Sequence, residues 1–174
     1  MISLIAGTNN QKSFTEKVAR LYLSRMEQQQ AHALYLSLTE LNGLVLDEQM
    51  YDTPPEIIEN LSQKYFAPSD KLLFIVPEYN GSIPGVIKLL FDAMDVKKYL
   101  YGKKAAIVGV ATGRAGNLRG IDHLTSILQH MKITVMPHIL PFSSVHLELA
   151  DNLQLQNPKT SQALDAHIQN FLKF

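Results

Sequence analysis

The chain has 174 residues, 46% of them hydrophobic and 18% charged, which suggests one ordinary globular domain, residues 1–174, with a substantial core. Lysine plus arginine number 16 and aspartate plus glutamate number 16, so the formal net charge of zero argues against a general nucleic-acid binder. The absence of cysteine excludes disulfides, thiolate metal sites and cysteine nucleophiles, and the scattered histidines lead us to expect no metal site.

The N-terminal segment and the apolar runs predict a cytoplasmic protein. Residues 1–7 lack a basic region and reach Gly7 too early for the apolar core of a signal peptide. No apolar run approaches the roughly 18 residues that a membrane span requires. We therefore expect no membrane partner.

Short apolar runs alternate with segments of helical periodicity along the chain. In chain order, we expect a strand at 2–6, a helix at 15–26, a strand at 33–38, a loop at 39–53, a helix at 54–65, a strand at 72–76, a helix at 82–94, a strand at 105–111, a helix at 121–131, a strand at 133–136 and a helix at 160–174. Ser82 is the expected N-cap of the third helix. Alternating strands and helices predict an α/β fold, a doubly wound five-stranded parallel sheet with helices on both faces. Its expected strand order is the flavodoxin-like 2-1-3-4-5.

In such a sheet the ligand lies beyond the carboxyl ends of the strands, where the strand order reverses. Three predicted loops meet there: residues 7–13, 77–85 and 112–120. They are among the segments richest in glycine and polar residues in the chain. This coincidence predicts a ligand site at that edge.

The first loop, residues 7–13, leads into a helix N-terminus, where free N–H groups and the helix dipole favour an anion. Neutral donors and one cation accompany it: Thr8, Asn10, Lys12 and Ser13. The loop has one glycine, so it is neither a Walker A loop nor a dinucleotide fingerprint, and it suits a monophosphate such as that of FMN. Alternatively, Ser13 and Glu16 form only a capping box.

The second loop, residues 77–85, offers more polar groups than a strand-to-helix connection needs. A flat heteroaromatic ring requires close backbone approach, which Gly81 permits, and contacts at its edge. Tyr79 and Asn80 can border such a ring, and backbone N–H groups around Glu78 to Ser82 can reach its heteroatoms. Alternatively, the segment is only a turn that ends in a cap.

The third loop, residues 112–120, contains three glycines, Gly113, Gly116 and Gly120, which would let the backbone embrace a ring edge. Arg114 and Arg119 belong to the same segment. Either arginine can bind the phosphate of a reduced pyridine nucleotide or be a solvated surface charge.

Residues 77–85, PEYNGSIPG, followed by a helix, closely resemble the signature of NADPH-dependent FMN reductases. These are flavodoxin-like flavoenzymes that include quinone, azo-dye and chromate reductases. The resemblance covers nearly the whole chain in element order. The first loop is similar to the family pattern G-S-x-R-x-x-S at Gly7 and Ser13, but Asn10 replaces the arginine, and Lys12 would compensate as a point charge. Residues 112–119 depart from the family's Ser/Thr-rich, Gly-Gly-containing turn.

The resemblance implies an FMN-dependent NAD(P)H oxidoreductase that passes hydride by a ping-pong scheme from NADPH or NADH to FMN and on to a small acceptor such as a quinone or flavin. Chemistry would be carried by FMN without a protein acid or base. The implied cofactor-binding residues are Thr8, Asn10, Lys12, Ser13, Pro77, Glu78, Tyr79, Asn80, Gly81, Ser82, Thr112, Gly113 and Gly116. Two alternatives stay open: a flavodoxin-like electron carrier, and a non-catalytic binding module with weakened FMN affinity.

The helix that follows the second loop, residues 86–94, predicts self-association. Its apolar residues surround most of its circumference: Val86, Ile87, Leu89, Leu90, Phe91, Ala93 and Met94. A helix that covers one sheet face should expose a polar side, so the pattern suggests a homodimer or tetramer, as the resemblance also implies. The alternative is deeper burial within one chain.

Overall fold

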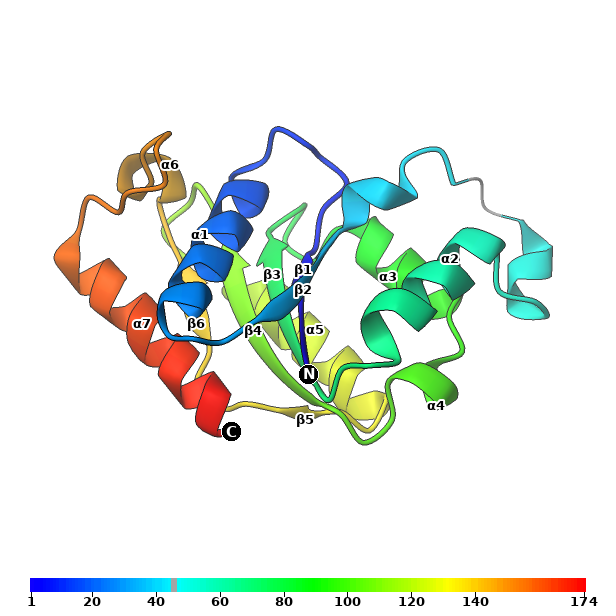
Figure 1. Ribbon diagram of the computed structural model, residues 1–174. Helices are drawn as coiled ribbons and strands as arrows, with labels where there is room; N and C mark the ends of the chain where they lie inside the picture. The colour runs from blue at the N-terminus through cyan, green and yellow to red at the C-terminus, as the bar shows by residue number, and fades with distance from the viewer. Residues whose placement is uncertain (45–46) are drawn as a thin grey trace.

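The computed structural model describes residues 1–44 and 47–174 and contains one six-stranded sheet in which every pairing is parallel (Figure 1). The strands are β1 (Ile2–Ala6), β2 (Ala33–Ser37), β3 (Lys71–Pro77), β4 (Lys104–Val110), β5 (Thr134–Val135) and β6 (Leu140–Phe142). The order is β2-β1-β3-β4-β5, and β6 also pairs with β4. The predicted fold class and strand order are confirmed.

Helices cover both faces of this sheet (Figure 1). They are α1 (Phe14–Gln28), α2 (Glu56–Leu61), α3 (Gly85–Asp92), α4 (Val96–Tyr99), α5 (Leu118–His130), α6 (Val145–Glu148) and α7 (Pro158–Lys173). Alternate strand residues point to opposite faces, which gives two cores. Ile5 and Phe74 pack with α2, α3 and α5, whereas Leu4 and Leu73 pack with α1 and α7.

The chain outside these helices and strands is partly ordered into short turns. The predicted loop at 39–53 includes 3₁₀ turns at Leu38–Leu41 and Glu48–Tyr51, and its residues 45–46 lie outside the described part. A π-helical turn, Ser62–Phe66, continues α2. No helix among the described residues is both long and apolar enough to cross a membrane.

The far edge of the sheet differs from the prediction. The strand expected at 133–136 is only two residues long, because it leaves β4 before Pro137. The chain then returns as β6, which pairs with the second half of β4 through Val108 to Val110. Two short strands thus share the place of one. Prolines at 137 and 141 hid β6 in the sequence, since proline is tolerated in strands mainly at edges.

Helix α3 begins at Gly85, and its N-cap residue is Pro84, which makes no side-chain capping bond. The predicted capping role of Ser82 is therefore wrong. The Ser82 hydroxyl instead lies 2.7 Å from Nδ1 of His123 on α5. This bond ties the loop before α3 to a neighbouring helix.

The apolar character of α3 is explained mostly by burial within the chain. Its residues Ile87, Leu90 and Phe91, and Ala93 and Met94 just after it, are at most 6% exposed. Val86 and Leu89 are the partly exposed ones. The structure supports the alternative of deeper burial, and self-association stays a prediction.

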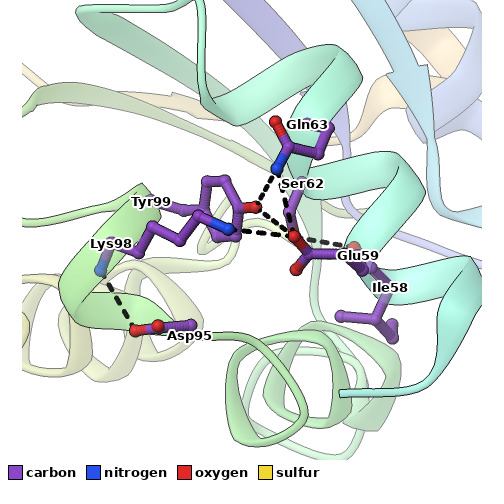
Figure 2. A network of polar contacts seen from close by, with 7 residues as sticks. All are labelled: Ile58, Glu59, Ser62, Gln63, Asp95, Lys98 and Tyr99. Atoms are coloured by element: carbon purple, nitrogen blue, oxygen red, sulfur yellow. Dashed lines mark hydrogen bonds and ion pairs between the residues drawn. The ribbon is translucent and has the colours of Figure 1, made fainter. Parts of the chain in front are cut away.

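A polar network joins α2 to α4 (Figure 2). The Glu59 carboxylate accepts hydrogen bonds from Tyr99 Oη at 2.5 Å, Lys98 Nζ at 3.0 Å and Gln63 Nε2 at 3.1 Å. Asp95 Oδ1 accepts from the Lys98 N–H at 3.1 Å and so caps α4. The bond from Tyr99, followed by those from Lys98 and Gln63, lowers the pKa of Glu59 to about 2. The network therefore orients α4 through a carboxylate that stays ionised at neutral pH.

Candidate functional site

The first loop leaves β1 through a tightly packed glycine. A Cβ on Gly7 would stand 2.8 Å from Ile87 Cδ1 and 3.2 Å from the Ile75 carbonyl oxygen. The Gly7 N–H donates to that same carbonyl at 2.8 Å. Glycine is required here because β1, β3 and α3 converge at this point.

Thr8 follows and is fully buried. Its hydroxyl lies 2.9 Å from Tyr79 Oη and accepts from the Asn10 N–H at 3.2 Å. The residue joins the first loop to the second, 71 positions along the chain. Thr8 therefore holds the two loops together, and its contact with a phosphate stays a prediction.

Ser13 occupies the N-cap of α1, and its Oγ accepts from the Glu16 N–H at 3.3 Å. Only this half of the alternative capping box forms. The Ser13 N–H donates to the Asn10 carbonyl at 3.2 Å, and the Glu16 carboxylate accepts from Tyr35 Oη and, at 2.5 Å, from Ser37 Oγ. The capping role and an anion-binding role are compatible, since the Ser13 hydroxyl proton stays available.

Burial, followed by the bond to Glu16, raises the pKa of Tyr35 well above its usual value, so its hydroxyl is a permanent donor to that carboxylate. The negative charge of Glu16 is thus held against β2 by two hydroxyls.

A hollow of about 270 Å³ opens at the N-terminus of α1. It is lined by Asn10, Lys12, Ser13, Phe14, Thr15, Pro77, Glu78, Tyr79, Val110, Ala111, Thr112 and Val145. All three predicted loops contribute. The sequence analysis missed the apolar residues of this set, which lie at the end of β4 and at the start of α1 and α6. Apolar residues at such places are normally predicted to belong to the hydrophobic core.

The second loop is a tight hairpin. The Tyr79 N–H donates to the Ser82 carbonyl at 2.9 Å, and the Ser82 N–H donates to the Tyr79 carbonyl at 3.1 Å. Asn80 and Gly81 between them have φ values of 53° and 75°. Two positive φ values are typical of a type I′ turn, for which Asn-Gly is the preferred sequence. Asn80 is therefore explained by the turn itself.

Some of the backbone N–H groups that were expected to reach a ring, those from Glu78 to Ser82, already form hydrogen bonds within the protein. The Glu78 N–H donates to the Val110 carbonyl at 3.1 Å, and those of Tyr79 and Ser82 are used across the turn. Within the described residues, the N–H groups of Asn80 and Gly81 donate to no backbone carbonyl. A ring edge would therefore meet these two groups at the hairpin tip.

A second hollow of about 310 Å³ lies at this tip. It is lined by Glu78, Asn80, Gly81, Ala111, Thr112, Gly113, Arg114 and Ala115. The two hollows share Glu78, Ala111 and Thr112 and are therefore adjacent. A ligand spanning both would place one end at α1 and the other at the hairpin.

The third loop is fixed by a residue that sequence reasoning missed. Asn117 is fully buried with φ of 67°, its Nδ2 donates to the Val76 carbonyl at 2.9 Å, and its Oδ1 accepts from the Gly120 N–H at 3.1 Å. It therefore caps α5 and fastens the loop to β3. An asparagine just before a helical pattern is a capping signal that would have found it.

Gly116 shapes this loop and does not line either hollow. It has φ of 60°, and a Cβ there would stand 2.7 Å from Pro141 Cβ. Thr112 and Gly113 line the hollow at the hairpin tip, as expected.

The residues present fit FMN. One hollow combines a helix N-terminus, the Lys12 ammonium and the Ser13 hydroxyl, which is the donor set for a phosphomonoester. The adjacent hollow offers free backbone N–H groups and the Thr112 hydroxyl beside a hairpin without bulky side chains at its tip.

A sequence profile of NADPH-dependent FMN reductases matches residues 1–147. The chain belongs to this family. The match contains all three loops, and the predicted family, the enzyme class of FMN-dependent NAD(P)H oxidoreductases and the FMN and NAD(P)H cofactors are confirmed.

The chain is also similar to curated proteins and to solved structures. The chain is 29% identical over 139 residues to 2-hydroxy-1,4-benzoquinone reductase of Burkholderia sp, covering 78% of this chain and 73% of that protein. It is 29% identical over 181 residues to a quinone reductase of Pseudomonas putida, covering 98% and 91%. The solved structure of FerB, a flavoenzyme NAD(P)H:(acceptor) oxidoreductase from Paracoccus denitrificans, superposes with a TM-score of 0.81 at 22% identity, covering 99% and 94%. This structural similarity supports the flavodoxin-like fold of the chain.

Proposed function

We propose that this FMN reductase family member passes electrons from NAD(P)H to a quinone or a similar small aromatic acceptor, with FMN held across the two hollows. The main support for this proposal is that the two hollows are adjacent. The hollow at the N-terminus of α1, which is suited to an anion, lies next to the hollow at the hairpin tip. Two relatives are named as quinone or benzoquinone reductases, which supports the acceptor class. FMN, when bound, supplies the two-electron exchange between nucleotide and acceptor.

Each loop has its own task in this proposal. Lys12, Ser13 and the first N–H groups of α1 bind the phosphate, with Asn10 at the side. The hairpin presents the Asn80 and Gly81 N–H groups to the ring edge, and Thr112 closes the opposite side. Thr8 acts as a positioning residue, because its hydroxyl contacts Tyr79.

A homodimer is part of the proposal, although most of α3 is buried. Ile83 and Ile127 are partly exposed in an apolar hollow of about 360 Å³ between the loop before α3 and α5. A second copy covering this hollow would keep water from the flavin edge. Sedimentation equilibrium at micromolar concentration tests this, and a monomer at all concentrations would contradict it. The cytoplasmic location and the single domain stay predictions.

The test of the function begins with FMN titration of the purified protein stripped of flavin, followed by absorbance at the flavin band. We expect saturable binding, bleaching on addition of NADPH, and steady NADPH oxidation when benzoquinone is supplied. No binding at about 100 μM FMN, where even a modest ligand raises the melting temperature by mass action, would overturn the proposal. FMN binding without bleaching by NADPH would instead favour an electron carrier.

A further inference from the structure

Two arginines stand at the hairpin tip. Arg114 lines the second hollow together with Gly81. Arg119, at the start of α5, places Nη1 4.0 Å from where a Cβ on Gly81 would stand. Both residues are exposed, so one arginine from the loop and one from the following helix lie at the same turn.

Neither guanidinium forms an ion pair with a carboxylate among the described residues. Arg25, by contrast, bonds Asp165 at 3.0 Å, and Lys98 bonds Glu59 at 3.0 Å. Lys88, on the other side of the hairpin, is paired with Asp92. The two arginines at the tip are therefore available to an anion from outside the chain.

His123 fixes the position of Arg119 relative to the hairpin. It lies four residues after Arg119 on α5, which places the two on one helix face. Its Nδ1 is 2.7 Å from Ser82 Oγ. The bond therefore ties the hairpin to the face of α5 that carries Arg119.

We propose that Arg114 and Arg119 bind the 2′-phosphate of NADPH and thereby make this enzyme prefer NADPH to NADH. The inference rests on the proposed function, in which the FMN phosphate is bound at the other hollow by Lys12 and Ser13. The arginines are then available to a different anion. The 2′-phosphomonoester is the one group by which NADPH differs from NADH, and a planar guanidinium binds such a group through two parallel hydrogen bonds.

Exposure of this pair agrees with that role. A co-substrate must arrive and leave in every turnover, which exposed groups permit. Solvent screening weakens each exposed contact, so the two arginines should give a moderate preference that falls with ionic strength.

The experiment uses FMN-loaded protein and isothermal titration calorimetry with two probes, adenosine 2′,5′-bisphosphate and adenosine 5′-monophosphate. We expect the bisphosphate to bind more tightly, and Arg114→Ala and Arg119→Ala each to reduce that preference by about threefold. In steady-state assays, KM for NADPH should rise about threefold more than KM for NADH in each variant. Arg114→Lys and Arg119→Lys should recover only part of the preference, because an ammonium lacks the planar fork.

Arg20→Ala is the matched control. It removes the same charge from an exposed residue on α1 whose guanidinium lies over the Tyr35 ring, and the preference between the two probes should not change. Equal binding of the two probes by the wild-type protein would overturn the inference. So would an equal rise in KM for both nucleotides, which would indicate contact with the shared pyrophosphate.

The FMN titration distinguishes a failure of this inference from a failure of the proposed FMN-dependent function. Failure to bind FMN would overturn both. Normal FMN binding and NADPH oxidation with no discrimination between the two nucleotides would overturn only the assignment of the arginines. A loss of FMN affinity in Arg114→Ala or Arg119→Ala, without a change in probe preference, would place the arginines on the flavin instead.

Discussion

Lys12 is the cation that lines the phosphate end of the candidate site, and its importance follows from its neighbour Asn10. Asn10 stands where the family pattern has an arginine, and its Oδ1 accepts from the Lys12 N–H at 3.1 Å. That turn fixes the backbone of Lys12, while its exposed ammonium supplies the charge. Lys12→Ala should therefore weaken FMN binding roughly fivefold at low ionic strength, and less at high salt, because an exposed charge is screened.

Flavin fluorescence quenching measures this change. Arg20→Ala provides the matched control, since Arg20 is an exposed cation of α1 that lies over the Tyr35 ring and lines neither hollow. Its FMN affinity should equal that of the wild-type protein. An equal loss in both variants would mean that general charge, rather than Lys12, attracts the phosphate.

At the scale of elements, the hairpin tip depends on backbone conformation more than on side-chain contacts. Gly81 has φ of 75°, and the nearest heavy atom to a Cβ there is Arg119 Nη1 at 4.0 Å, so the space is open but the backbone is left-handed. Gly81→Ala should lower the free energy of unfolding by about 1 kcal/mol through strain alone. It should also weaken FMN binding, because a shifted tip moves the Asn80 and Gly81 N–H groups.

Replacing the glycine four residues later should have the opposite effect on the free energy of unfolding. Gly85, the first residue of α3, has no left-handed φ, and a Cβ added there would meet no described heavy atom within 4 Å. Gly85→Ala should raise the free energy of unfolding by up to about 1 kcal/mol and leave FMN binding unchanged. Urea denaturation and FMN titration of both variants provide the measurement. Equal effects of the two substitutions would show that the hairpin tip carries no strain and no flavin contact.

At the scale of the whole molecule, the sequence predicts the sheet and the location of the site better than the tasks of residues within it. Periodicity and the ends of parallel strands are local features, so β1, β3, β4 and their three loops were all expected. The partners of Thr8, Gly116 and Asn117 are not local. Thr8 meets Tyr79 71 residues away, Asn117 meets Val76 41 residues away, and Gly116 packs on Pro141 from another strand. Such contacts exist only after the chain has folded.

A buried histidine in the last helix, α7, should make the stability of the protein depend on pH. Residues 158–173 form α7, which lies beyond the part matched by the family profile and buries Leu164 and Phe171 against the sheet. His167 of α7 is fully buried, its Nδ1 lies 3.3 Å from Tyr22 Oη on α1, and its Nε2 has no hydrogen-bond partner within the described residues. Burial, followed by the nearby His138, lowers the pKa of His167 to about 4 from 6.5.

A histidine whose pKa is lower in the folded protein contributes stability that is present above pH 6.5 and is lost as the pH falls toward 4, because the unfolded chain binds the proton first. This one residue should lower the free energy of unfolding by up to about 2 kcal/mol between pH 7 and pH 5. His167→Phe should remove that loss, but it should also lower the stability at pH 7, since the buried Tyr22 hydroxyl loses its partner and the larger ring must be accommodated. Urea denaturation at the two pH values measures the difference. His146→Gln, at an exposed residue of α6, should lose as much stability as the wild-type protein. A full loss in His167→Phe would show that other groups on α1 and α7 set the pH dependence.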